Sequence, residues 1–580
     1  MHRVLNSSIK SSSASRASPM HHSTSNENLK LRLVSGSLDG GELPDFGAST
    51  IDELLQRSVA KAPAAPALSA LGATINYQQL HDLSEGVCAW LLDQGLQPGA
   101  RVAVALPNML AHPIACLGII RAGLTAVCVN PLYTAQELAQ VFRDSEIKAV
   151  FLFEPMGQGV QQAMHEAGVK IAVRVAPGDQ LGWRRPLVNW VARKRLGGGA
   201  VRSVQAVPWR EVVSTRQNGS SQRPPADAEQ PAFMIYSGGT TGQPKGVPIT
   251  HRALLFNVAQ QYSALRLHLL GRAEHDYQLL LAVPLYHILG LGNLLFALAR
   301  GGKAVLVMNP RDTAAFTKEW SRHRISSFPG VSTLYSSLLE NETFRALDFS
   351  GLAICLGAGM PVNAATAKRW HEVTGCHVTE AYGMTETGLI SCNPAGPSRP
   401  GSVGFPVTGI EISLRDDSGH EVTMGEGEIC VRSPAIMAGY WRRPEDNAAA
   451  FTDDGFFRTG DIGQFDPDGY LRLVDRKKEM IISSGFKVFP SEIERVLNAH
   501  PGVMESAVVP AADEKAGEVP IAYVVRRQPC LEEAHVKAHC EQHLVSYKRP
   551  RRIIFKDELP KSNVGKILRK ALVDLQESAQ

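Results

Sequence analysis

The alternation of short β-rich runs with helical patterns is the feature that most restricts how this chain can fold. Apolar runs rich in β-branched residues occupy positions 101–108, 148–153, 170–175 and 303–308. Runs of this kind predict buried strands. The segments 117–123 and 313–324 predict helices. Because strands and helices in alternation are typical of α/β layers with largely parallel sheets, we expect an α/β protein.

Composition limits the class of function. The 580 residues are 44% hydrophobic and 20% charged, which is ordinary for a soluble globular protein long enough for several domains. A net charge of +4 is too small to indicate nucleic acid as the main partner. The nine cysteines include no pair with C-x-x-C spacing, so the sequence predicts neither a zinc site nor a disulfide framework. A reducing compartment is indicated.

Residues 1–38 differ from the rest of the chain. They hold nine serines between Ser7 and Ser25 and one acid, Glu27, and they lack the apolar stretch of a secretory signal. A disordered tail is the favoured interpretation. An organelle transit peptide, which is also serine-rich, basic and poor in acids, stays an alternative.

Two segments raise the question of membrane contact. Residues 279–299 carry no formal charge over 21 positions, but Pro284, Gly290 and Gly292 interrupt them. We therefore predict a buried strand, a turn and a buried helix instead of a membrane span. Residues 183–196 combine tryptophans at helical spacing with five bases. The favoured interpretation is a solvated insertion whose apolar edge packs on the domain, and the alternative is peripheral contact with an anionic membrane.

A glycine-rich loop follows an apolar run that ends at Ser237. Its sequence, YSGGTTGQPKGV over 236–247, allows backbone N–H groups to turn onto phosphate oxygens. It is not a Walker loop, because Lys245 stands between Pro244 and Gly246. A glycine loop at the carboxyl end of a strand is where α/β sheets bind ligands, so we predict a phosphate or nucleotide site.

Four later segments complete a pattern. They are EAYGMTET at 380–387, DGFFRTGDIGQFDPDGYLRLVDRKK at 454–478, KKEMIISSGFKVFPSEIE at 477–494 and LPKSNVGKILRK at 559–570. With the glycine loop and in this order, they resemble the adenylate-forming superfamily of acyl-CoA synthetases, firefly luciferase and adenylation domains. Ser237 and Gly238 depart from the Thr and Ser that are commoner in that loop. The segments PLYHILG and NPRD look most similar to bacterial long-chain acyl-CoA ligases.

The resemblance implies a fold and a first reaction. The fold is a large multi-sheet N-terminal domain, about 39–475, and a small α+β C-terminal domain, 476–580. The reaction is attack of a carboxylate on the α-phosphorus of ATP, with Mg²⁺ at Glu386. The residues implied at the ATP phosphates are Ser237, Gly238, Gly239, Thr240, Thr241, Gly242, Lys245 and Thr385. Those implied at adenine and ribose are Ala358, Gly359, Glu380, Ala381, Tyr382, Asp461 and Arg476.

A second reaction with CoA is implied by the same resemblance. Lys566 would be the catalytic cation of adenylation, and Lys478 would be the hinge about which the C-terminal domain rotates. After rotation, Ser484 and Gly485 would face the site on the CoA side. Together with the reducing compartment indicated by the cysteines, we expect a cytoplasmic location, with peripheral contact at the inner face of a membrane as the alternative.

The identity of the substrate acid is limited by the residue at position 287 and by the lack of acidic residues around it. His287 stands where amino-acid adenylation domains usually carry an Asp, and no acid occurs between Asp276 and Asp312. A buried ammonium group without a carboxylate would be costly, which disfavours amino acids. We expect His287 to line the carboxylate pocket of a fatty acid, with a long chain favoured and medium-chain or aryl acids as alternatives. Two other functions stay open: an acyl-AMP ligase that loads a carrier protein, and a non-catalytic acyl-nucleotide binder.

Overall fold

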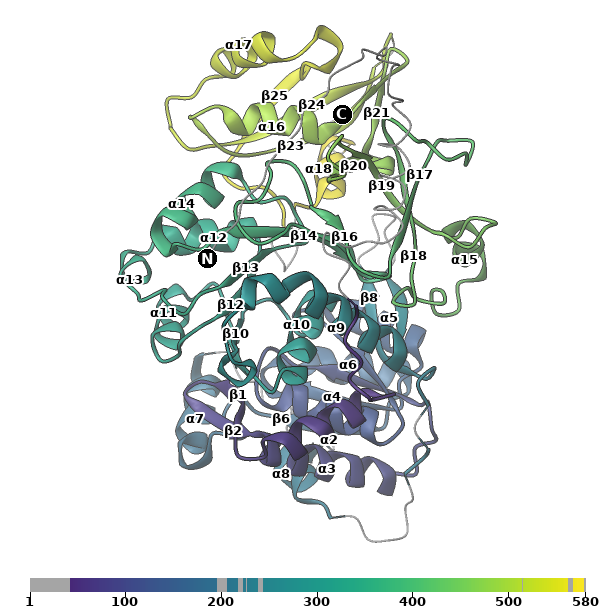
Figure 1. Cartoon of the computed structure of the whole chain (residues 1–580), viewed down its shortest axis with the longest axis vertical. Helices are drawn as coiled ribbons and strands as arrows, with labels where there is room; N and C mark the ends of the chain where they lie inside the picture. Colours follow the sequence, from purple (N-terminus) through teal and green to yellow (C-terminus); the bar gives the residue numbers. More distant parts are fainter. Residues whose placement is uncertain are drawn as a thin grey trace, which may run out of the picture.

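The computed structural model of the protein describes residues 42–195, 206–216, 223–225, 227–237, 244–513, 515–561 and 567–577. Within these residues the strands form four sheets. In Figure 1 the purple and blue N-terminal elements lie at the bottom and the yellow-green C-terminal sheet lies at the top. The predicted tail, 1–38, falls outside the described residues.

A seven-stranded sheet contains three of the four predicted strands. Its order is β7-β6-β5-β3-β4-β8-β9, with β3 Arg101–Ala105, β4 Thr125–Cys128, β5 Ala149–Phe153, β6 Ile171–Val175, β7 Val207–Pro208, β8 Pro231–Ser237 and β9 Lys245–Thr250. All neighbours are parallel except β8 and β9. The prediction of largely parallel strands is confirmed for this sheet.

Both faces of the seven-stranded sheet are buried. Val102 and Val104 of β3 belong to the core on one face, with α3 (Tyr77–Asp93) and α4 (Ala111–Arg121). Ala103 and Ala105 point to the other face, with α5 (Ala135–Ser145) and α6 (Gly157–Ala167). Side chains alternate along a strand, so a strand covered on both sides needs apolar residues at every position. This explains why the run around 101–105 has no polar alternation.

A nine-stranded sheet follows, in the order β16-β15-β14-β13-β12-β10-β11-β1-β2. Its strands are β1 Pro66–Ala70, β2 Ala73–Asn76, β10 Gln278–Leu281, β11 Lys303–Leu306, β12 Ser327–Gly330, β13 Ile354–Gly357, β14 Val378–Met384, β15 Gly388–Cys392 and β16 Phe405–Pro406. Its helices are α2 Ile51–Lys61, α9 His251–Leu265, α10 Ile288–Ala299, α11 Thr313–Ser321, α12 Ser332–Leu339, α13 Glu342–Arg345 and α14 Ala364–Thr374. The uncharged segment 279–299 is thus strand, turn and helix, as predicted.

Two smaller sheets complete the chain. An antiparallel sheet joins β17 Glu411–Arg415, β18 Gly427–Arg432, β19 Phe457–Phe465 and β20 Leu471–Arg476. The C-terminal sheet joins β21 Ile481–Ser483, β22 Phe486–Val488, β23 Val503–Asp513, β24 Gly517–Arg526 and β25 Arg552–Lys556, with helices α16 Pro490–Ala499, α17 Glu533–His543 and α18 Arg569–Glu577. This last sheet has a hydrophobic core of its own.

The described part of the basic segment, 183–195, forms the end of a short 3₁₀ turn, Gly182–Arg184, and helix α7, Arg185–Arg195. Asn189 ties α7 to the domain by accepting a 2.6 Å hydrogen bond from the backbone N–H of Gly178. Trp183, Leu187 and Trp190 are 87%, 62% and 54% exposed. The expectation that the apolar edge packs on the domain is therefore wrong, since the anchoring face of the helix is the one that carries Asn189.

None of the helices in the described ranges combines the length and the hydropathy needed to cross a bilayer.

Candidate active site

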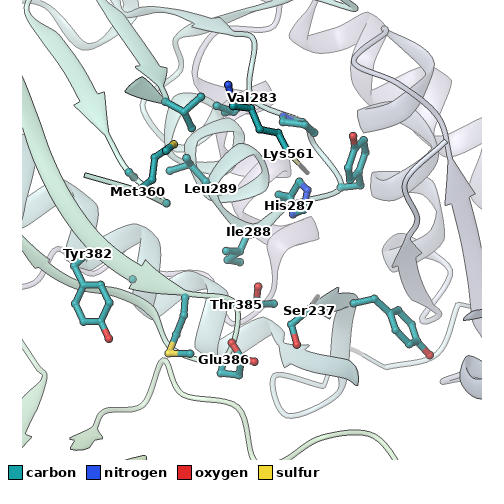
Figure 2. A pocket seen from close by; sticks show the side chains of 18 of the residues that line it. Ser237, Val283, His287, Ile288, Leu289, Met360, Tyr382, Thr385, Glu386 and Lys561 are labelled. Atoms are coloured by element: carbon teal, nitrogen blue, oxygen red, sulfur yellow. The ribbon is translucent and has the colours of Figure 1, made fainter. Parts of the chain in front are cut away.

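A cavity of about 1940 Å³ lies where the nine-stranded sheet, the seven-stranded sheet and the C-terminal sheet meet. Figure 2 shows Ser237, Thr385 and Glu386 in one part of it, and Val283, Leu289 and Met360 in another. The lining residues that the sequence had singled out are Ser237, Lys245, His287, Ala358, Gly359, Ala381, Tyr382, Thr385, Glu386, Arg476 and Lys478. Segments far apart in the chain thus meet in one chamber.

Thr385 and Glu386 sit on the turn between the antiparallel strands β14 and β15. The strands approach too closely for a side chain at Gly383, where a Cβ would lie 2.2 Å from the carbonyl oxygen of Gly388. Gly388 has φ +67°, and its Cβ would lie 2.4 Å from Nδ2 of Asn257 on α9. Glycine at both positions is therefore a steric requirement of the turn that presents Thr385 and Glu386.

Glu386 is 6% exposed, and its carboxylate accepts a 3.1 Å hydrogen bond from the Tyr440 hydroxyl. The carboxylate and the Thr385 hydroxyl offer hard oxygen ligands on one cavity wall. Mg²⁺ prefers one or two carboxylates together with phosphate oxygens. The residues present therefore fit a magnesium ion that is shared with bound phosphates.

Ser237 and Lys245 are opposite partners at the end of the β8–β9 hairpin, so they bracket the glycine loop. Lys245 Nζ lies 2.5 Å from Oδ1 of Asp446 and 4.9 Å from the ring centre of Tyr440. The predicted phosphate ligands Gly238, Gly239, Thr240, Thr241 and Gly242 lie outside the described residues. The hairpin brings the lysine to the cavity, where it is paired with a carboxylate.

Tyr382, Asp461 and Arg476 form a linked group. The Tyr382 hydroxyl donates a 2.5 Å hydrogen bond to Oδ2 of Asp461, and Arg476 Nε lies 2.7 Å from Oδ1 of the same carboxylate. Asp461 and Arg476 are direct partners across β19 and β20. Burial lowers the pKa of Arg476, but the negative charges around it, led by Asp461, together outweigh burial, and the net pKa is raised. The carboxylate that the resemblance assigns to ribose is thus already held by two protein groups.

The segment 357–360 and the start of β14 build the floor next to Tyr382. Gly359 has φ +81°, a left-handed conformation that glycine adopts without strain. Ala358, Gly359 and Ala381 line the cavity, while Glu380 is not among its lining residues. Burial raises the pKa of Glu380 to about 7, although its carboxylate accepts a hydrogen bond from the Val362 N–H.

His287 stands directly before α10 and faces the cavity. Burial lowers its pKa to about 4, so the imidazole is neutral at pH 7. The chain makes a close turn here, because a Cβ on Gly290 would lie 2.1 Å from the carbonyl oxygen of Pro284. A neutral imidazole at the positive end of a helix can donate to a carboxylate without adding charge.

The C-terminal sheet and α18 close the chamber. Lys561, Ile567 and Arg569 line the cavity, and Lys561 pairs with Ile567 in an isolated bridge. Lys561 Nζ lies 2.7 Å from Glu505, and Arg569 lies 2.7 Å from Glu494. Lys566, the predicted catalytic cation, lies between these residues in sequence but outside the described ones.

Lys478 belongs to a single 3₁₀ turn, Lys477–Glu479, that connects β20 to β21. Asp475, next to this turn, accepts a 2.8 Å hydrogen bond from the backbone N–H of Ser491 on α16. Ser484 and Gly485 form the turn of the β21–β22 hairpin with φ values of 52° and 82°. They are not among the described lining residues, so this arrangement presents the Lys561–Ile567 side of the C-terminal sheet to the cavity.

Sequence reasoning missed several groups that complete the chamber. Asp446 and Tyr440 contact Lys245 and Glu386 from the segment before β19, which lies outside the five motifs. Asn257 and Gln261 line the cavity from α9, and Gln261 donates a 3.0 Å hydrogen bond to Asn257. Both lie on a helix that carries other polar residues as well, so the sequence offered no signal that singled out these two.

Comparison with known proteins agrees with this geometry. The family model "AMP-binding enzyme" matches residues 55–441, and "AMP-binding enzyme C-terminal domain" matches residues 492–566. The chain is 40% identical to a long-chain-fatty-acid–CoA ligase of Yersinia pestis over 92% of its length and 95% of the relative. It is 39% identical to a ligase of the same name from Escherichia coli O157:H7, with the same coverage of 92% and 95%.

A solved structure is also similar. ATP-bound MatB from Rhodopseudomonas palustris superposes with a TM-score of 0.78 at 28% identity, over 91% of this chain and 99% of that one. The superposition covers both the large α/β part and the small C-terminal part. The two-part fold predicted from the sequence is therefore confirmed. The chain belongs to the AMP-binding enzyme family.

Proposed function

We propose that this protein is an AMP-forming acyl-CoA ligase whose substrate is a long-chain fatty acid. The main support for the proposal is that one cavity is lined both by the large N-terminal part and by the C-terminal part. This cavity places the Thr385–Glu386 turn, the end of the β8–β9 hairpin and His287 opposite residues of the C-terminal sheet. The ligases from Yersinia pestis and Escherichia coli, which are about 40% identical over nearly the whole chain, support the same function.

In the first step, a carboxylate oxygen of the fatty acid attacks the α-phosphorus of ATP. The bond to the bridging oxygen breaks, and pyrophosphate leaves with that electron pair. Both reactants are anions, so the site must supply positive charge and hydrogen-bond donors. Lys566 would lie between the carboxylate and the α-phosphate. Thr385 would donate to the α-phosphate.

The glycine loop would hold the departing phosphates. Gly238, Gly239, Thr240, Thr241 and Gly242 would donate from backbone and hydroxyl groups, beside Ser237 and Lys245. Glu386 would hold Mg²⁺, which supplies charge neutralisation at the phosphates. Lys245 lies in the cavity, where it would exchange its Asp446 partner for phosphate oxygens.

The nucleoside would bind on the opposite wall. Tyr382 would present its ring to adenine beside the small residues Ala358, Gly359 and Ala381, with the half-buried Glu380 next to them. Asp461 would accept from ribose hydroxyls while Arg476 holds its other oxygen. Support comes from the placement of Tyr382, Ala358, Gly359, Ala381 and Arg476 on the cavity wall.

In the second step, the sulfur of CoA attacks the acyl carbon and its thiol proton passes to solvent. The bond between the acyl carbon and the phosphate oxygen breaks, and AMP leaves with that electron pair. We propose a boundary near 475/476, with domains 39–475 and 476–580, and rotation about Lys478. Rotation would withdraw Lys566 and bring Ser484 and Gly485 to the cavity. Support comes from the single 3₁₀ turn that joins the two parts, since a hinge needs only a few residues to absorb backbone rotation.

The acyl chain would extend among apolar side chains of the cavity. Val283, Ile288, Leu289 and Met360 line that part, and His287 stands at its edge. The volume of about 1940 Å³ exceeds what a nucleotide alone requires, because typical ligand pockets are roughly 300–1,000 Å³. A medium-chain or aryl acid is the second candidate, since small acids would also fit.

The decisive experiment measures pyrophosphate release from ATP and Mg²⁺ across saturated acids from acetate to stearate, with and without CoA. We expect a CoA-dependent maximum of pyrophosphate release at long chains. Lys566→Ala should lose this activity. Lys556→Ala is the control and should keep it, because Lys556 is an exposed residue at the end of β25. Turnover only with short or aryl acids would overturn the substrate. Release that never depends on CoA would instead indicate an acyl-AMP ligase that serves a carrier protein, and ATP binding without turnover would indicate a non-catalytic binder.

We further propose peripheral contact with the inner, cytoplasmic face of a membrane through 183–196. The exposed Trp183, Leu187 and Trp190 support it, together with Lys194, whose Nζ lies 4.2 Å from the Trp190 ring. Tryptophans beside bases are typical of interfacial helices. Replacement of the three apolar residues by Ser should abolish co-sedimentation with phosphatidylglycerol vesicles. Met424→Ser, at a residue that is also 87% exposed, is the matched control; equal binding of both variants would refute the contact.

A further inference from the structure

A cluster of three buried side chains lies outside the catalytic groups. His112 and Cys116 are one helical turn apart on α4, and Cys128 is the last residue of β4. Their side-chain nitrogen and sulfur atoms all lie within 4.8 Å of one another. The three residues are 2%, 4% and 3% exposed. Among the residues that the structure describes, this is the one group of three such ligands.

We propose that His112, Cys116 and Cys128 bind one zinc ion at a site that joins α4 to β4, and that a water molecule completes the tetrahedron as the fourth ligand. Residues four apart on a helix share a face, so His112 and Cys116 present their donor atoms together. Cys128 supplies the third donor from the strand that precedes the loop at Asn130. Two thiolates and an imidazole are common zinc ligands.

The histidine is oriented as a metal ligand would be. Its Nδ1 lies 2.9 Å from the backbone oxygen of Leu106, so that the ring donates there and leaves the lone pair of Nε2 free. The ring also contacts the Cys128 thiol. A backbone carbonyl that fixes the ring from behind is the usual outer partner of a zinc-bound histidine.

Charge balance favours a divalent ion. A divalent ion with two thiolates and a neutral imidazole is a neutral unit, which an apolar interior tolerates better than a net charge. Metal binding would displace the protons of both thiols. Soft sulfur ligands disfavour Mg²⁺, which keeps this site separate from Glu386.

The site would stiffen one wall of the chamber. Leu106 precedes Pro107 and Asn108, and both of these line the cavity. Asn108 donates hydrogen bonds of 3.1 and 2.9 Å to the backbone oxygens of Leu281 and Val283. Zinc would thus hold the loop that fastens the end of β10.

Cys355 and Cys376 offer a matched control. They are a second pair of buried thiols in mutual contact, but no histidine joins them within the described residues. A metal held simply by neighbouring thiols would use either pair. A metal held by the full donor set would use only His112, Cys116 and Cys128.

The test uses the full-length protein, stripped with chelator under reducing conditions and then dialysed against Zn²⁺ or Co²⁺. We expect one metal per chain by elemental analysis, thiolate-to-cobalt charge-transfer absorption, and a higher melting temperature with Zn²⁺. Zinc affinity should fall at least about 100-fold in Cys128→Ala and His112→Gln, and stay unchanged in Cys376→Ala.

Absence of the charge-transfer absorption in the wild-type protein would overturn the proposal, even if a variant fails to fold. Retention of that absorption in Cys128→Ala, or its loss in Cys376→Ala, would also overturn it. So would a Cys116–Cys128 disulfide that forms in place of metal binding when the reduced protein is exposed to Zn²⁺ in air.

Discussion

Tyr382 and Asp461 are joined by a 2.5 Å hydrogen bond, although one belongs to the nine-stranded sheet and the other to the antiparallel sheet that follows it. Arg476 takes the remaining oxygen of the same carboxylate at 2.7 Å. The nucleoside wall of the chamber is therefore a preassembled unit of three side chains from two sheets. Its rigidity does not depend on a bound ligand.

Tyr382→Phe should test this unit, because it keeps the ring and removes only the hydroxyl. A hydrogen bond to a charged group contributes about 1.5–3 kcal/mol, so the melting temperature should fall and ATP should bind several-fold more weakly. Differential scanning calorimetry and isothermal titration would measure the two effects. In combination with Asp461→Asn, the losses should be less than additive, because both changes remove the same bond. Fully additive losses would contradict the link.

His287 should make stability depend on pH. Its pKa is lowered by burial to about 4 from an ordinary value of 6.5. Between these values the unfolded chain binds a proton that the folded chain does not, so stability falls as pH drops from 6.5 to 4 and levels off below. The effect is at most about 3.5 kcal/mol, since each pH unit between the two pKa values is worth about 1.4 kcal/mol.

The measurement is the melting temperature of the wild type and His287→Gln over that pH range. The variant should lose less stability than the wild type as the solution is acidified. His251, whose pKa burial also lowers to about 4, contributes equally to both proteins and cancels in the difference. Parallel curves throughout would show that His287 is accessible to protons in the folded state.

Lys245 and Asp446 should have opposite effects on nucleotide affinity. Asp446 competes with phosphate for the lysine, and the pair is partly exposed, so their attraction is worth roughly 0–1 kcal/mol. Asp446→Asn should tighten ATP binding by up to about fivefold. Lys245→Ala should weaken it. Equilibrium binding of ATP without acid substrate measures both, and weaker binding in Asp446→Asn would mean that the carboxylate serves the nucleotide directly.

Lys478→Pro should separate the two half-reactions. Proline fixes φ and removes a backbone donor, so it would restrict rotation within the 3₁₀ turn between β20 and β21. Single-turnover pyrophosphate release should persist, while acyl-CoA formation should fall by roughly 100-fold or more if the hinge is needed for the second geometry. Lys478→Ala is the control and should retain both. An equal loss of both steps in the proline variant would count against a hinge at this position.

The sequence predicted local elements well and long-range pairings poorly. The run at 101–105 and the strand–turn–helix of 279–299 were predicted because continuous apolar runs and interrupting prolines or glycines are local signals. The partners of Asp461 and Lys245 were not, because each lies in a distant segment whose side-chain direction depends on the packed fold. The exposure of Trp183 was missed for the same reason, since periodicity gives a helix face but not what covers it.

Gly388 lies against Asn257, and this contact has a consequence for substrate selection. Asn257 and Gln261 belong to the wall of the chamber, whereas Gly388 ends the turn that presents Thr385 and Glu386. A ligand that displaces the helix would move the turn with it, because no free space separates them. An acid that fits poorly would then bind normally but react slowly at phosphorus. Poor and good acids would therefore differ more in kcat than in KM.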